Sequence, residues 1–75
     1  MTKEFKLEVA MRYIEEANSI LTKVNNILKD MEDNEGSLMG QGILRNINHL
    51  REHVGNEIVL ERIEMAKKKE KEIEE

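Results

Sequence analysis

The stretch that decides the fold is residues 7–31, LEVAMRYIEEANSILTKVNNILKDM, which contains neither Gly nor Pro. Its apolar residues recur at heptad spacing, which is typical of an α-helix that buries one face. Three neighbouring heptad columns are apolar: Leu7, Ile14, Leu21 and Leu28; Ala10, Ala17, Val24 and Met31; Tyr13, Ile20 and Ile27. Together they form a stripe about 120° wide, broader than the seam of a two-stranded coiled coil. This helix is therefore expected to pack against at least two others, with Leu21 and Leu28 buried mid-stripe.

Turn-forming residues follow the stripe and end the helix. The run Asp33-Asn34-Glu35-Gly36-Ser37 predicts a hairpin turn, in which Gly36 can adopt a positive φ. Gly40 and Gly42 come next, and each glycine costs about 1 kcal/mol inside a helix. We therefore expect a single helical domain over residues 1–75, with a first helix over about 3–32, a turn over about 33–42 and a second helix over about 43–72.

The second helix carries its own apolar stripe, which is expected to pack antiparallel on the first helix: Met39, Ile43, Ile47, Leu50, Val54 and Ile58. At Gly55-Asn56 this pattern changes, because Val59, Ile63 and Ala66 fall on nearly the opposite side of a continuous helix. Gly55 could end the helix and Asn56 could start a third one, giving a three-helix bundle. Alternatively the helix continues and lies between its own partner helix and a second molecule. The absence of Pro or a linker favours continuity.

Composition limits the class of protein. A compact monomer of 8.8 kDa would bury at best about 63% of its unfolded surface, which is a marginal core. The chain has no Cys, so it has no disulfide or thiolate metal cluster, and we expect a cytoplasmic protein. No apolar run approaches the ~18 residues of a membrane span, and the start MTKEFKLEVA lacks the apolar segment of a secretory signal. We expect neither membrane insertion nor export.

One segment resembles a metal-binding motif. His49-Leu50-Arg51-Glu52-His53 matches the H-x-x-E-H pattern of inverted zinc peptidases, in which two imidazoles four residues apart share a metal. Those enzymes also need a third ligand from a separate element and a cleft for a peptide, which a short helical chain does not readily build. We therefore predict no metal, no cofactor, no small-molecule substrate and no enzyme activity. A metal-dependent hydrolase using His49, Glu52 and His53 is the last alternative.

Nucleic-acid binding has a weak basis in the sequence. Arg45 and Arg51 are the best candidate contacts, yet neither half of the chain is basic. Residues 1–37 carry five Lys/Arg and eight Asp/Glu, and residues 38–75 carry seven and eight. Phosphate contact needs a basic footprint, so we expect no nucleic-acid partner. The net charge of -4 allows the alternative of a DNA-mimicking protein, although solubility explains this charge as well.

These observations predict an all-α fold, an antiparallel helical hairpin resembling a coiled coil. Its wide stripes exceed what two helices can cover, so we expect a homodimer that forms a four-helix bundle. The predicted interface residues are Leu7, Ile14, Ile20, Leu21, Ile27, Leu28, Ile58, Val59 and Ile63. The expected function is that of a small non-enzymatic protein-interaction module, an adaptor, regulator or inhibitor that presents helical surface to a protein partner. The alternative is a helical nucleic-acid-associated or DNA-mimicking protein.

Overall fold

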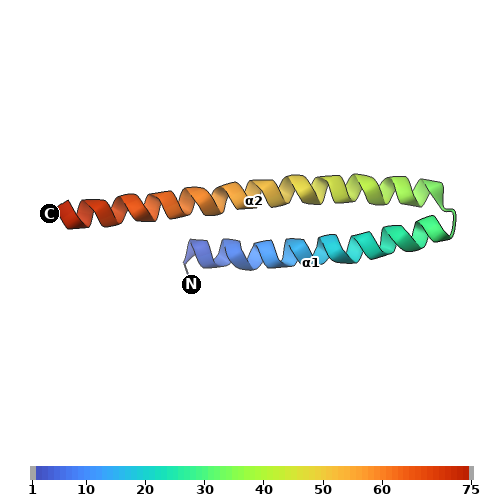
Figure 1. The fold of residues 1–75 in the computed structure, drawn as a ribbon, viewed down its shortest axis with the longest axis horizontal. Helices are drawn as coiled ribbons and strands as arrows, with labels where there is room; N and C mark the ends of the chain where they lie inside the picture. The colour runs from blue at the N-terminus through green and yellow to red at the C-terminus, as the bar shows by residue number, and fades with distance from the viewer. Residues whose placement is uncertain (1, 75) are drawn as a thin grey trace.

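Two long helices make up the fold. The computed structural model describes the backbone of residues 2–74 and the side chains of residues 2–69. Helix α1 spans Lys3–Asp30 and helix α2 spans Asn34–Glu74, and the two run antiparallel as a hairpin (Figure 1). The predicted all-α helical hairpin is therefore confirmed.

Helix α1 begins at a well-formed cap. Thr2 has an extended backbone, and its hydroxyl oxygen accepts a hydrogen bond from the backbone N–H of Phe5 at 3.1 Å. Glu4 in the first turn and Lys29 in the last turn have the charges that the helix dipole favours at these ends. Local sequence thus determines where α1 starts.

Helix α1 ends in a left-handed residue. Glu32 has a φ of 61°, and the backbone N–H groups of Glu32 and Asp33 donate to the carbonyls of Lys29 and Leu28 at 3.0 and 2.9 Å. This pair of bonds is a Schellman motif, in which the left-handed position usually belongs to Gly. Gly36 does not use the positive φ that a glycine allows, because the chain reverses four residues earlier, at Glu32.

Helix α2 begins directly after this turn. The carboxylate of Asp33 accepts a hydrogen bond from the backbone N–H of Gly36 at 2.9 Å, and the backbone carbonyl of Asp33 accepts one from the backbone N–H of Ser37 at 2.9 Å. Asp33 is thus a side-chain cap, and its carboxylate occupies the space where a Cβ on residue 36 would lie. The predicted turn over 33–42 is therefore wrong. The helix starts nine residues before Ile43, because this cap stabilises a first turn that the glycines alone would weaken.

Helix α2 continues through Gly55 without a break. Gly55 does not have a positive φ, and a Cβ there would lie 3.7 Å from the terminal methyl of Met11, an ordinary packing distance. The helix therefore follows the continuous alternative, and the three-helix bundle does not form in this hairpin. Within residues 2–74, no helix is both long enough and apolar enough to cross a membrane.

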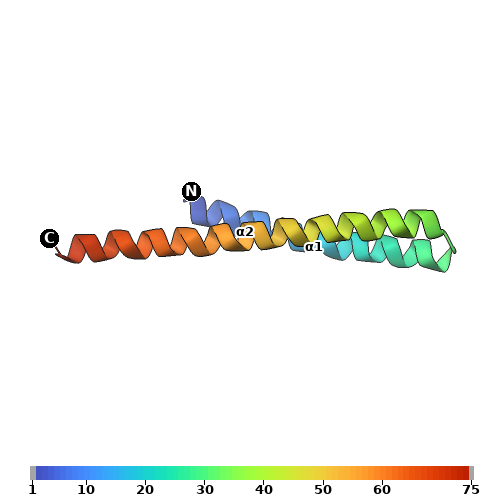
Figure 2. The same ribbon diagram turned by 90° about the horizontal axis from the view of Figure 1, so that it is seen from above.

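The hairpin is a single layer of two helices. Its Cα atoms span 65 × 18 × 12 Å, and the radius of gyration is 18.2 Å, against about 11 Å for a compact domain of this length. The helices wind around each other, so they cross in the view from above (Figure 2). Helix α2 also extends well past the N-terminus of α1 (Figure 1). Both broad faces of the layer are consequently open to water.

Candidate protein-interaction surface

The two helices meet along what we call the inner seam. In α1 its residues alternate at spacings of four and three, the pattern of interlocking helices: Leu7, Met11, Ile14, Asn18, Leu21, Asn25 and Leu28. In α2 the matching residues are Ser37, Gly40, Leu44, Ile47, Val54, Ile58 and Glu61. All of these are buried or half-buried. These two rows of residues form the part of the interface between α1 and α2 that follows the heptad pattern.

The inner seam buries little apolar surface. Val54 is the one apolar side chain that counts as buried among the described residues, and the two other buried residues, Asn25 and Ser37, are polar. Leu21 and Leu28 were predicted to be buried, but both are only half-buried. That prediction is wrong for the hairpin alone, because two helices touch along one line and leave the flanks of each seam residue open to water.

Asn25 and Gly40 form the closest approach in the inner seam. A Cβ on residue 40 would lie 2.8 Å from Oδ1 of Asn25, closer than real Cβ contacts come. Asn25 is 5% exposed, and its Oδ1 has no hydrogen-bond partner among residues 2–69. The missing side chain of Gly40 therefore lets the two helices come together near the turn, with a polar group held between them.

Helix α1 carries a second heptad seam whose large apolar side chains are exposed. Its residues repeat the spacings of three and four: Ala10, Tyr13, Ala17, Ile20, Val24, Ile27 and Met31. Four of them are more than half exposed: Tyr13 (66%), Ile20 (59%), Ile27 (58%) and Met31 (69%). We call this row the outer seam of α1. It lies about 100° around the helix from the inner seam.

Helix α2 has a corresponding outer seam: Met39, Ile43, Asn46, Leu50, His53, Glu57 and Leu60. Its large apolar members are also exposed, Met39 by 62% and Leu60 by 55%. Each outer seam is rotated from its inner seam in the same sense, and the helices run antiparallel. Both outer seams therefore lie on one face of the hairpin, which we call the outer face.

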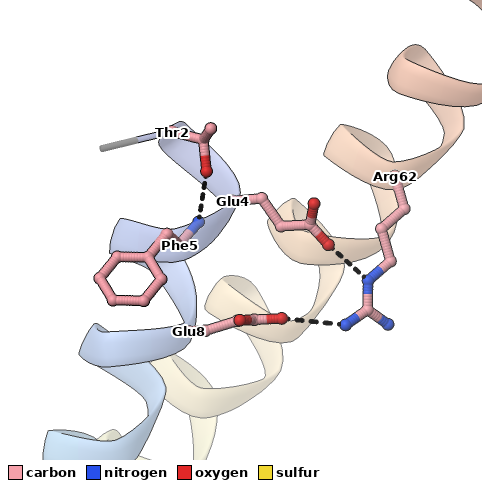
Figure 3. Close-up of polar contacts among 5 residues, drawn as sticks. All are labelled: Thr2, Glu4, Phe5, Glu8 and Arg62. Atoms are coloured by element: carbon pink, nitrogen blue, oxygen red, sulfur yellow. Dashed lines mark hydrogen bonds and ion pairs between the residues drawn. The ribbon is translucent and has the colours of Figure 1, made fainter.

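Charged side chains mark the opposite face near the N-terminus of α1. The guanidinium of Arg62 donates from Nε to Glu4 at 2.8 Å and from Nη2 to Glu8 at 3.1 Å (Figure 3). These hydrogen bonds, first the one to Glu4, raise the pKa of Arg62 further above its ordinary value, so the group stays charged. All three side chains are partly exposed, so the cluster aligns the helices more than it stabilises them.

Beside this cluster the two helices stop overlapping. Lys3 pairs loosely with Glu61, with Nζ and Oε2 3.7 Å apart, and α2 continues alone beyond that point. The shallow pocket in this corner is lined by Glu4, Arg62, Met65, Ala66 and Lys69. It is open to solvent and holds no group of side chains arranged for catalysis.

The predicted interface residues fall into two sets. Half-buried in the inner seam lie Leu7, Ile14, Leu21, Leu28 and Ile58. The other four are exposed: Ile20, Ile27, Val59 and Ile63. Ile20 and Ile27 belong to the outer face. The stripe predicted for the second helix also divides, because Met39, Ile43 and Leu50 are exposed and belong to the outer seam rather than the inner seam. Near the turn the inner seam of α2 is formed by small or polar residues, Ser37 and Gly40. A pattern based on apolar residues alone does not identify them.

The alternative candidate residues lie apart from any enclosed site. His49, Glu52 and His53 are all exposed on α2, as are Arg45 and Arg51. Among the described side chains, no group of three or more His, Cys, Asp or Glu could hold a metal ion. The outer face is therefore the surface on which a functional argument can be built.

Known proteins add no assignment to this surface. Comparison of the chain with protein-family models, curated proteins and solved structures finds no match.

Proposed function

We propose that this chain is a small non-enzymatic protein-interaction module that acts through its outer face, and that the first protein to cover this face is a second copy of the chain. Two hairpins would then form a four-helix bundle with the outer seams in its core. The observation that carries the proposal is the pair of exposed heptad seams on one face. An adaptor, regulator or inhibitor in the cytoplasm fits such a module.

The exposed area of the hairpin supports the proposal. Its accessible surface is 6290 Å², against about 4,800 Å² for a compact protein of the same mass. The excess of about 1,500 Å² exceeds the ~800 Å² that each partner buries in a stable interface of standard size. Exposed apolar patches larger than a few hundred Å² usually mark interaction sites.

Stability supports it as well. Ordering each residue costs about 1 to 2 kcal/mol of conformational entropy, and the burial of apolar surface has to offset this cost. A hairpin whose described core contains one buried apolar side chain, Val54, has little with which to do so. Folding and association are therefore coupled, and the melting temperature should rise with protein concentration.

The proposal is tested with neighbouring substitutions on opposite sides of α1. Ile20→Glu places a charge in the centre of the outer seam, where a second copy would leave it buried and unpaired. Ser19→Glu adds the same charge one residue away, on the exposed side that faces away from both seams. Light scattering at tens of micromolar should give twice 8.8 kDa for the wild type and for Ser19→Glu. Ile20→Glu should give the monomer mass or fail to fold.

Two results would contradict the proposal. One is a wild-type mass of 8.8 kDa with a melting temperature that does not depend on concentration. The other is an Ile20→Glu variant that keeps both the mass and the melting temperature of Ser19→Glu.

A further inference from the structure

We infer that the two copies pair with their turns at the same end of the bundle, so that α1 of each copy packs antiparallel on α2 of the other. The inference rests on the proposed homodimer and specifies its arrangement. It follows from an uneven distribution of polarity along the outer face.

The outer face is apolar near the turn and charged near the open end of the hairpin. In the half nearest the turn, the outer-seam residues of both helices are apolar apart from Asn46: Ala17, Ile20, Val24, Ile27, Met31, Met39, Ile43 and Leu50. At the open end, the heptad spacing of the α1 seam continues with Lys6 and Lys3. The α2 seam carries Glu57 and then Glu64 at the same end. At this end the seam positions of α1 are thus basic, and two of those of α2 are acidic.

Contacts within the hairpin fix which residues lie at the same level. Lys3 lies beside Glu61 at the open end, and Asn25 lies beside Gly40 near the turn. Each step toward the turn along α1 is therefore matched by one step toward the turn along α2. By this register, Ile27 lies nearly level with Met39 and Lys6 lies between Glu57 and Leu60.

Same-end pairing matches these levels between copies. A two-fold axis along the hairpin brings α1 of one copy over α2 of the other at the same height. Val24 and Ile27 then face Ile43 and Met39 of the second copy, and Lys6 lies between Glu57 and Leu60 of the second copy, within reach of the Glu57 carboxylate. Most apolar residues meet apolar residues near the turn, and the lysines lie near carboxylates at the open end, so the two ends of the face match their counterparts.

Pairing with the turns at opposite ends would place the charged end of one outer face against the apolar end of the other. With the two hairpins fully overlapped, α1 lies over α1 of the second copy and α2 lies over α2. Lys6 would then lie against Ile27 of the second copy, and Glu57 would lie against Met39. Each such contact buries a charge without a partner, which is strongly unfavourable. A staggered pairing of the turn-proximal halves avoids this clash, but it leaves Tyr13 and Leu60 uncovered and buries less area.

The arrangement gives the bundle two different ends. Each hairpin has its turn at one end and the extension of α2 beyond the N-terminus of α1 at the other (Figure 1). In the paired bundle both turns therefore lie at one end, and both extensions leave from the other. The exposed Lys67, Lys68 and Lys69 of the two copies then lie close together, beyond the Arg62 cluster. A further protein partner would meet paired helical arms at that end only.

Distances between spin labels test the inference. The chain has no Cys, so Glu35→Cys at the turn and Lys68→Cys at the open end each give one label per copy. Both positions are exposed and outside the two seams. Pulsed electron paramagnetic resonance should give distances within about 30 Å for both variants, since the helices of a bundle lie only 8–10 Å apart.

Other distance patterns overturn the inference. Opposite-end pairing would separate the two Lys68 labels by more than about 50 Å, because helices rise 1.5 Å per residue. Short Glu35 distances with long Lys68 distances would identify the staggered pairing, and long distances for both would identify full overlap. Light scattering on the same samples separates these results from failure of the homodimer itself, in which the mass is 8.8 kDa and no distance is measured.

Discussion

Replacing Gly40 with Ala should destabilise the protein, although Ala is the better helix former. An Ala in place of Gly inside a helix stabilises it by about 1 kcal/mol when nothing obstructs the new methyl group. At residue 40 the methyl would lie 2.8 Å from Oδ1 and 3.3 Å from Cγ of Asn25. Asn25 is nearly buried and has little room to turn away, so the helices must separate locally. Overpacking of this kind costs about 1 to 3 kcal/mol, which exceeds the gain in helix propensity.

Gly42 provides the matched control in the same helix. A Cβ at that position would meet nothing within 4 Å, so Gly42→Ala should stabilise the protein by about 1 kcal/mol. Urea unfolding at one fixed protein concentration should then separate the two variants by about 2 kcal/mol. The double variant Asn25→Ala, Gly40→Ala should recover part of the loss, because it removes the clashing amide. If Gly40→Ala were as stable as Gly42→Ala, the close approach at Asn25 would not exist.

Three further predictions concern the turn and the histidines. Glu32→Gly should raise the free energy of unfolding, measured in urea, by about 1 kcal/mol, because Glu32 has a φ of 61° that favours Gly. If stability did not increase, the chain would reverse direction at a residue other than Glu32. Asp33→Ala should lower the free energy of unfolding by about 1 kcal/mol, since it removes the cap on Gly36, and Asp33→Asn should retain most of the stability. EDTA should leave the melting temperature unchanged, because His49 and His53 supply only two ligands of a tetrahedral site. A melting temperature that falls with EDTA and recovers with zinc would contradict this prediction.

The periodicity of residues 7–31 was enough to predict a helix, a hairpin and a stripe too wide for one partner. These features depend on local spacing and on propensity, which a single chain segment contains. The outer-seam residues Ile20 and Ile27 were correctly separated as a flanking column. Sequence also indicated continuity through Gly55, because no Pro or linker interrupts the helix there.

The start of α2 and the division of the stripe could not be read from the pattern. A stripe three columns wide can receive a partner helix on either flank, and both choices bury apolar side chains. The flank was decided by small residues of α2, since Ser37 and Gly40 fit against the side of α1 that carries Asn25. That fit exists only when two segments far apart in the sequence are in contact. Local spacing therefore determined the helices and their apolar columns, and only the packing of α2 on α1 decided which columns are covered and which are left exposed.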